Sequence, residues 1–177
     1  MVWRVDDPQG NEASKVRWEL VPYMNGRVLD LGCGPYKTFP HFTGVDNGHH
    51  DAQFGWKNQA DEIVKTCENL GIFATRSCDA VFSSHLLEHI PFENVVPTLN
   101  EWCRVVKSGG YLMLYLPDED EYPKVGDPHA NPDHKWNVNY EKITEAMEKI
   151  PRGWDLIDFQ KRNQDNEYSL FFVFKLQ

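Results

Sequence analysis

The chain has 177 residues, 41% of them hydrophobic and 13% aromatic, so a single domain can bury a full core and wholesale disorder is excluded. The 27 acidic residues outnumber the 18 basic ones, and a net charge of −9 argues against a protein that binds nucleic acid. The sequence contains no apolar run of about 18 residues, and residues 1–10 carry Asp6, Asp7 and Pro8 where a signal peptide would be apolar. We therefore expect a cytoplasmic protein that does not bind membranes.

The cysteines indicate the same compartment. The four cysteines, Cys33, Cys67, Cys78 and Cys103, are widely spaced and form no Cys-x-x-Cys pair. A disulfide framework or a structural zinc site is not expected from this spacing, and a reducing environment is the default.

The N-terminal half predicts a loose arm at residues 1–11 and then short elements separated by turns. Residues 12–23 carry apolar side chains at helical spacing and predict an amphipathic helix that ends near Pro22. Short apolar runs then predict strands at residues 27–31, 43–46, 62–65 and 79–83.

The C-terminal half predicts a helix over residues 95–106 that stops at Ser108-Gly109-Gly110, followed by a strand at 111–116. A polar stretch with four prolines fills residues 117–139, and a loop of this length in a compact domain is expected to serve the active site. A helix at residues 140–150 and strands at 154–159 and 168–175 complete the chain. Apolar strands alternating with helices predict a three-layer α/β sandwich, with a mostly parallel sheet and an antiparallel C-terminal hairpin. We expect a single domain over residues 1–177.

The turn after the first predicted strand carries the clearest functional signal. The segment Val28-Leu29-Asp30-Leu31-Gly32-Cys33-Gly34-Pro35 places two glycines where the backbone can approach a ligand without a Cβ in the way. Asp46 ends the second predicted strand, where a carboxylate can accept hydrogen bonds from a ribose diol. Together these features predict a nucleotide-type ligand at the carboxyl end of the sheet.

A dinucleotide is disfavoured as that ligand. The third glycine position of a dinucleotide fingerprint is Lys37, and Asp46 follows Gly34 by 12 residues, against about 20 in that fingerprint.

The same segments resemble a known family. Residues 28–35 resemble the first motif of class I S-adenosylmethionine-dependent methyltransferases, and Asp46 resembles their ribose-binding acid. The similarity continues through Ser83-Ser84-His85-Leu86-Leu87-Glu88-His89-Ile90 and through residues 101–112, and it covers about residues 15–116. The resemblance implies a Rossmann-like fold. The short spacing before Asp46 implies that the first crossover helix is short or missing.

The resemblance also implies that the cofactor is S-adenosylmethionine. Gly32 and Gly34 would pass under its methionine part, Asp46 would hold the ribose, and Ser83 and His85 would lie under the sulfonium. The full set implied to form the cofactor site is Asp30, Gly32, Cys33, Gly34, Asp46, Asn47, Cys67, Glu68, Ser83 and His85.

Two positions depart from the family pattern. Tyr36 replaces the common third glycine, and Thr66 replaces an acid that often contacts adenine. Adenine recognition is then expected to use backbone groups. The short first loop and the segment 131–136 are similar to a branch of the family associated with saccharide and lipopolysaccharide biosynthesis.

Methyl transfer from a sulfonium needs mainly proximity and orientation, and a general base matters only when the acceptor is a hydroxyl. We take His85 and His134 as catalytic candidates, because the pKa of histidine lies near neutrality, and expect His89 to be structural. Neither His49-His50-Asp51 nor His129 with Asp133-His134 has a recognised zinc spacing, so no metal site is expected.

We therefore expect a methyltransferase that acts on an oxygen of a small-molecule or saccharide acceptor, as a monomer or homodimer. Nucleic-acid bases are disfavoured as acceptors because residues 83–86 read Ser-Ser-His-Leu and lack the Asn/Asp-Pro-Pro-Tyr/Phe segment. The alternative is a non-catalytic module that binds S-adenosylmethionine or S-adenosylhomocysteine.

Overall fold

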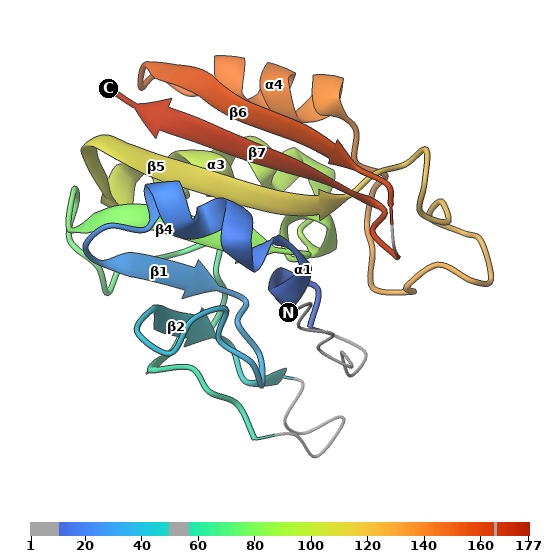
Figure 1. Ribbon diagram of the computed structural model, residues 1–177, viewed down its shortest axis with the longest axis horizontal. Coiled ribbons are helices and arrows are strands. Elements are labelled where there is room, and N and C mark those ends of the chain that lie inside the picture. The colour runs from blue at the N-terminus through green and yellow to red at the C-terminus, as the bar shows by residue number, and fades with distance from the viewer. Residues whose placement is uncertain (1–10, 50–56, 165) are drawn as a thin grey trace.

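The computed structural model describes residues 11–49, 57–164 and 166–177. Most of the expected N-terminal arm, together with His50 and Asp51, lies outside these residues. The described chain forms a seven-stranded sheet with the order β3-β2-β1-β4-β5-β7-β6, and helices lie on both of its faces (Figure 1).

The strands from β3 to β5 run parallel to one another, whereas β7 is antiparallel to both β5 and β6. The predicted α/β fold with an antiparallel C-terminal pair is confirmed. The strands are β1 (Val28–Leu31), β2 (Thr43–Asp46), β3 (Glu62–Ile63), β4 (Cys78–Ser84), β5 (Val106–Pro117), β6 (Trp154–Arg162) and β7 (Ser169–Leu176). The third strand covers two residues instead of the predicted 62–65, and both residues are exposed at the edge of the sheet.

The helices bury both faces of the sheet. They are α1 (Ala13–Val16), η1 (Arg17–Tyr23), η2 (Leu87–His89), η3 (Phe92–Asn94), α3 (Val95–Val105) and α4 (Tyr140–Glu148). Along β5, Leu112 and Leu114 belong to the core on the side of α3 and α4, whereas Tyr115 belongs to the core that contains Val16 and Leu20. This alternation produces the predicted three-layer sandwich (Figure 1).

The amphipathic helix predicted over residues 12–23 is present, but it is α-helical only in its first turn. Only Ala13–Val16 is α-helical, and Arg17–Tyr23 forms a 3₁₀ helix that contains Pro22. Proline lacks the N–H that an α-helix would use at this position, and its ring clashes with the preceding turn. The segment still buries Val16 and Leu20 against the sheet, as its apolar spacing predicts.

The loop from residue 32 to residue 42 contains no helix, as the short spacing before Asp46 predicts. The loop is held to the sheet by a hydrogen bond of 2.6 Å from the Thr38 amide to the Asp30 carboxylate. Lys37 pairs with Asp61 at 2.9 Å, which fixes the same loop from the other side. The first crossover helix of the fold is therefore replaced by an ordered loop.

The prediction that residues 108–110 form the stop between a helix and the next strand is wrong. Helix α3 ends at Val105 and β5 begins at the next residue, so the glycines lie within the strand. Gly109 has a φ of +79°, and a Cβ at Gly110 would collide with the carbonyl oxygen of Asp79. Gly110 therefore permits the close approach of β5 to β4, and Gly109 permits the left-handed backbone, at an irregularity in the pairing of the two strands between Cys78 and Ala80.

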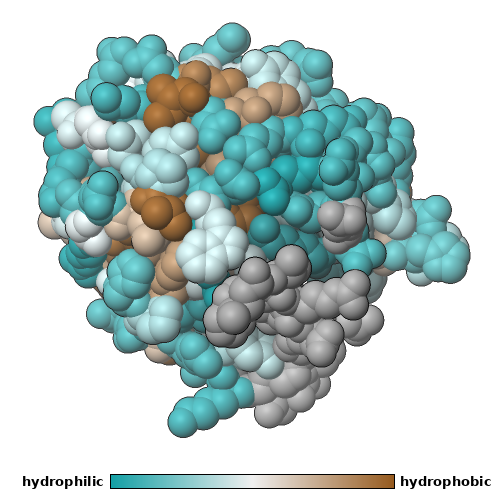
Figure 2. Space-filling model, viewed as in Figure 1, coloured by the Kyte–Doolittle hydropathy of each residue, from teal (hydrophilic) through white to brown (hydrophobic). Residues whose placement is uncertain are grey.

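The visible surface is mostly hydrophilic, and hydrophobic atoms form small separate areas on it (Figure 2). In the described part of the chain, no helix has both the length and the apolar character needed to cross a membrane. All four cysteines are free and buried.

Candidate active site

A cavity of about 330 Å³ lies where the carboxyl ends of the parallel strands meet. Strand β1 has parallel neighbours on both sides, β2 and β4, and such a switch point is where open α/β sheets bind ligands. The cavity is lined by Gly32, Asp46, Asn47, His49, Thr66, Cys67, Glu68, His85, Leu86, His89, Ile90, Pro91, Asp133 and Lys135. Six of the ten predicted cofactor residues are therefore together in one cavity: Gly32, Asp46, Asn47, Cys67, Glu68 and His85.

The glycine loop supplies bare backbone beside this cavity. Gly32 and Gly34 have φ angles of +72° and +51°, which glycine adopts without strain. A Cβ at Gly32 would lie 3.0 Å from the Leu86 side chain, whereas a Cβ at Gly34 would meet nothing within 4 Å. Gly32 therefore serves close packing, and Gly34 leaves open space for a ligand.

Asp46 connects the glycine loop to the end of β2. Its Oδ2 accepts a hydrogen bond of 3.0 Å from the Gly34 amide. Its Oδ1 accepts from the Gly48 amide at 2.8 Å and from the Asn58 side chain at 2.9 Å. A carboxylate has about four acceptor positions, so Oδ2 retains capacity for a further donor such as a ribose hydroxyl.

The loop after β3 forms another part of the wall. The Trp102 indole donates a hydrogen bond of 2.8 Å to the Cys67 carbonyl, which fixes this loop on α3. Glu68 accepts from the Thr66 hydroxyl and from the Asn94 side chain, both at 3.0 Å. Burial raises the pKa of the Cys67 thiol to about 12, so this wall presents a neutral thiol beside the cavity.

Four predicted cofactor residues do not line the cavity. Gly34 lies against Asp46, as described above. Asp30 is buried behind the loop, and burial raises the pKa of its carboxyl to about 6 even though the Thr38 amide stabilises the charged form. The Cys33 and Ser83 side chains are buried as well. Asp30, Cys33 and Ser83 thus support the wall from behind.

His85 follows β4 in a left-handed conformation, with a φ of +48°. This turn directs its ring toward two side chains. Its Nε2 lies 3.0 Å from the Ser169 hydroxyl, and its Nδ1 lies 3.6 Å from Oε1 of Glu88. Burial lowers the pKa of His85 well below its usual value, so the imidazole is neutral at physiological pH.

His134 lies beside the cavity and not in its lining. The loop that carries it docks onto η2 through the Trp136 indole, which donates to the carbonyls of Leu87 and Ile90. Burial lowers the pKa of His134, and its Nε2 lies 3.6 Å from Oε1 of Glu88. The neighbouring residues Asp133 and Lys135 extend into the cavity lining.

Glu88 is a site residue to which the sequence motifs give no role. Its side chain is fully buried, and this burial raises the pKa of its carboxyl to about 8. Neither of its oxygens has a hydrogen-bond partner among the described residues. The sequence carries a signal for this residue, because Glu88 is an acid that, together with His89, lies between apolar residues in the segment Leu86-Leu87-Glu88-His89-Ile90.

Comparisons with known proteins agree with this geometry. Residues 29–114 match the family model described as a methyltransferase domain. The PH0226 protein of Pyrococcus horikoshii has a similar structure, with a TM-score of 0.69 and 18% identity over 98% of this chain and 94% of that one. A SAM-dependent methyltransferase from Archaeoglobus fulgidus has a TM-score of 0.67 and 18% identity, over 92% of this chain and 94% of that one.

A third similar structure contains ligands. It is the 1,6-didemethyltoxoflavin-N1-methyltransferase of Burkholderia thailandensis with bound 1,6-didemethyltoxoflavin and S-adenosylhomocysteine. Its TM-score is 0.64 and its identity 14%, over 94% of this chain and 77% of that one. A search of curated protein sequences found no match.

The family match and the fold point to the same class of protein. Residues 29–114 are similar to a methyltransferase domain, and the sheet has the order of a Rossmann-like methyltransferase fold. The cofactor of this class is S-adenosylmethionine.

Proposed function

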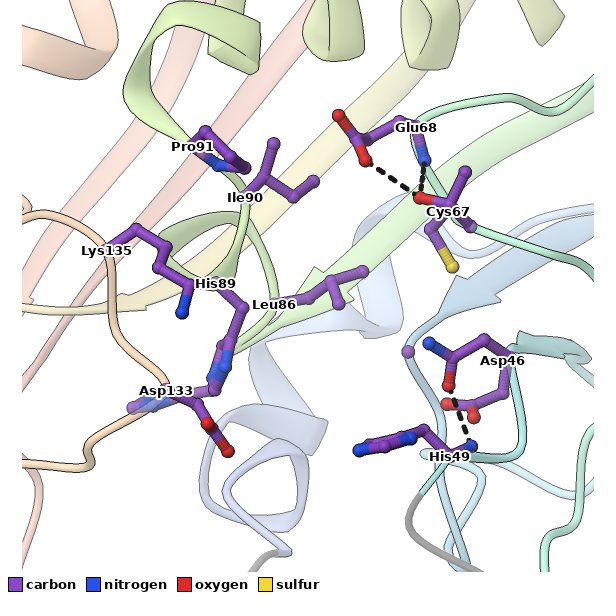
Figure 3. Close-up of a pocket in the computed structure, with 14 residues that line it drawn as sticks. Asp46, His49, Cys67, Glu68, Leu86, His89, Ile90, Pro91, Asp133 and Lys135 are labelled. Atoms are coloured by element: carbon purple, nitrogen blue, oxygen red, sulfur yellow. Dashed lines mark hydrogen bonds between the residues drawn. The ribbon is translucent and has the colours of Figure 1, made fainter.

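We propose that this protein transfers a methyl group from S-adenosylmethionine to an oxygen of a small-molecule or saccharide acceptor. The observation that carries the proposal is the presence of two polar walls in one cavity. Figure 3 shows Asp46, Cys67 and Glu68 on one side and His89, Asp133 and Lys135 on the other. The first wall suits the cofactor, and the second suits a polar acceptor.

The residues present fit an adenosyl ligand. Gly34 offers open space at its Cα, and Asp46 retains an acceptor position beside the cavity. In the proposal, Asp46 holds the ribose, Asn47, Cys67 and Glu68 flank the adenine, and Gly32 with Gly34 lies along the methionine part. Asp30 and Cys33 hold the loop that shapes this surface. The cofactor supplies a methyl group on a positive sulfur, which needs no further activation.

The acceptor wall combines side chains that can bind hydroxyl groups. Asp133 accepts and Lys135 donates hydrogen bonds, and both extend from the loop that docks onto η2. His85 lies at the end of β4, in the cavity, and its lowered pKa keeps it neutral. A neutral imidazole can receive the proton of an acceptor hydroxyl. His85 is therefore our candidate for the general base, because His134, the other histidine considered, lies outside the cavity lining.

One observation favours the alternative, a binding module without turnover. The Asp46 carboxylate already accepts three hydrogen bonds within the protein, and the Asn58 side chain is the partner most easily replaced by a ligand. A module that keeps Asn58 in place would bind S-adenosylhomocysteine weakly and form no methylated product.

The experiment that separates the two functions measures transfer of a radiolabelled methyl group. The full chain is incubated with labelled S-adenosylmethionine and a panel of hydroxyl-bearing saccharides and small metabolites. We expect label in at least one acceptor and its loss in Asp46→Ala, while Asp155→Ala on the exposed edge strand β6 retains it. The absence of labelled product across the panel, with S-adenosylhomocysteine still bound, would favour the binding module.

A further inference from the structure

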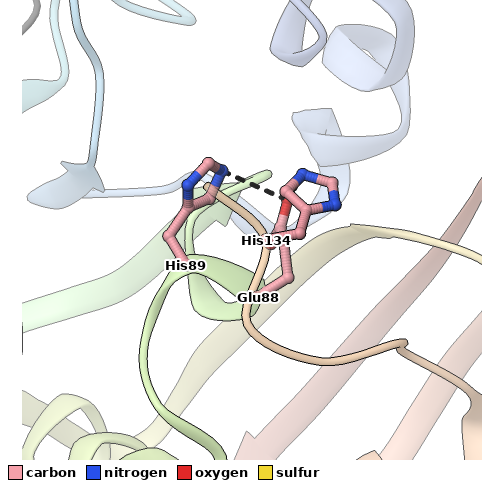
Figure 4. Close-up of side chains that lie close together, drawn as sticks. All are labelled: Glu88, His89 and His134. Carbon is pink, nitrogen blue, oxygen red and sulfur yellow. Dashed lines mark ion pairs between the residues drawn. The ribbon is translucent and has the colours of Figure 1, made fainter. Parts of the chain in front are cut away.

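We infer that Glu88, His89 and His134 form a binding site for one divalent transition-metal ion at the acceptor wall of the cavity. The sequence predicts no metal site, because none of its histidine pairs has a zinc spacing. The fold brings together ligands from two distant segments, the 3₁₀ helix η2 and the loop that carries His134. Figure 4 shows the three side chains close together.

The distances suit a shared ion. One ligand atom from each residue lies within 4.8 Å of the other two. Oε1 of Glu88 lies 3.6 Å from Nε2 of His134 and 3.9 Å from Nε2 of His89. Three ligands of a tetrahedral ion lie about 3.4 Å apart when each bond is about 2.1 Å, so a small inward movement of these side chains would complete the coordination.

The surroundings of the Glu88 carboxylate indicate, independently of the distances, that a cation belongs at this place. Its side chain has no exposed surface, and both oxygens lack a hydrogen bond among the described residues. The surrounding imidazole nitrogens are 3.6 Å or more away, which is too far for a hydrogen bond. A buried carboxyl without a partner costs free energy, and a cation between Glu88 and the histidines would satisfy it.

The ligand types indicate the class of ion. Two imidazoles and one carboxylate match catalytic zinc sites with an open fourth position, and imidazole nitrogen favours late first-row ions over magnesium. The side chain of His89 is 26% exposed and lines the cavity, so an ion can enter from that side. An oxygen ligand at the open position would become more acidic. This consequence depends on the proposed function, whereas binding of the ion does not.

Calorimetry of the full chain, treated with a chelator and free of S-adenosylmethionine, tests the inference. We expect Zn²⁺ to bind with one ion per chain, and at least tenfold more tightly than Mg²⁺. His89→Ala and His134→Ala should each weaken Zn²⁺ binding at least tenfold. His129→Ala is the matched control, because His129 is exposed in the same loop and should leave the affinity unchanged.

Cobalt provides a second readout. Co²⁺ should give visible absorption in the wild-type protein, and this absorption should be lost in His89→Ala. The His89 side chain is partly exposed, so its removal should leave the fold intact. An unchanged circular dichroism spectrum would show that the loss of absorption does not come from misfolding. No Zn²⁺ binding at millimolar concentration, or equal binding in the wild type and both histidine variants, would overturn the inference. S-adenosylhomocysteine is titrated separately into the metal-free protein. Binding of S-adenosylhomocysteine without binding of a metal ion would reject the metal site and leave the proposed function standing.

Discussion

The amide of Gly34 donates a hydrogen bond of 3.0 Å to the carboxylate of Asp46. This bond joins the loop after β1 to the end of β2, so the bare backbone and the acid of the proposed cofactor site are held in one fixed arrangement. Because Asp46 is 95% buried, the arrangement is shielded from water on its inner side.

Removal of the Asp46 carboxylate should weaken the binding of S-adenosylhomocysteine. Asp46→Ala removes the acceptor of the ribose and releases the Gly34 amide. We expect a loss of about tenfold to a hundredfold in affinity, as for hydrogen bonds to a charged group. Calorimetric titration measures it, with Asp155→Ala as the control. Equal affinity in the wild type and Asp46→Ala would limit Asp46 to a structural role in the turn.

Two glycines that both have a left-handed backbone should differ in their effect on binding. Gly34 and Gly109 have φ angles of +51° and +79°, and a Cβ at either would meet nothing within 4 Å. Gly34→Ala and Gly109→Ala should each lower the free energy of unfolding by about 1–2 kcal/mol. Only Gly34→Ala should also reduce the affinity for S-adenosylhomocysteine, because its Cβ would extend toward the ligand.

Urea denaturation measures the free energy of unfolding of each variant. Calorimetric titration of the folded variants measures their affinity for S-adenosylhomocysteine. If the two alanine variants lose affinity equally, the effect would come from strain, and the proposed cradle at Gly34 would be wrong.

The buried carboxyl of Asp30 should make stability depend on pH. Burial raises its pKa in the folded protein to about 6, from a reference value of 3.8. The folded state therefore binds more protons than the unfolded state between these values, and stability falls as the pH rises from about 4 to about 6. The contribution is about 3 kcal/mol at most.

Asp30→Asn keeps an oxygen that can accept from the Thr38 amide and should remove this part of the pH dependence. Urea denaturation at several pH values between 4 and 7 gives the comparison, and Asp155→Asn serves as an exposed control. An unchanged slope in Asp30→Asn would show that Asp30 ionises normally in the folded protein.

Arg104 should stabilise the loops beside the cavity in a way that lysine cannot reproduce. Its guanidinium donates to the carbonyls of Leu70 and Phe73, both at 3.1 Å, and pairs with Glu101. Arg104→Lys loses this planar fork and should lower the free energy of unfolding by about 2 kcal/mol. Arg76→Lys, in an exposed turn of the same region, should change it little. Thermal denaturation compares the two variants, and equal melting temperatures would contradict the assigned role.

The predictable part of the site lies where local sequence determines the geometry. The glycines after β1 and the acid that ends β2 could be placed from the alternation of apolar runs and turns, because parallel strands bring their carboxyl ends together. The missing first helix followed from the short spacing between Gly34 and Asp46, since too few residues remain for a full crossover.

The unpredictable part depends on contacts between distant segments. Glu88 and His134 lie 46 positions apart in the sequence. Hydrogen bonds from the Trp136 indole and the Lys135 amide dock the loop on η2 and bring them to 3.6 Å. The start of β5 was missed for a related reason. The pattern Ser-Gly-Gly marks a helix stop in most contexts, but Gly110 instead permits β5 to pass against Asp79 on the neighbouring strand.

A crystal structure of the full chain with S-adenosylhomocysteine tests the central claim most directly. We predict that the ligand occupies the cavity between Asp46 and His89, with the ribose hydroxyls within hydrogen-bond distance of the Asp46 carboxylate and the sulfur near the end of β4. A cavity that stays empty at saturating ligand, or a ribose bound away from Asp46, would contradict it.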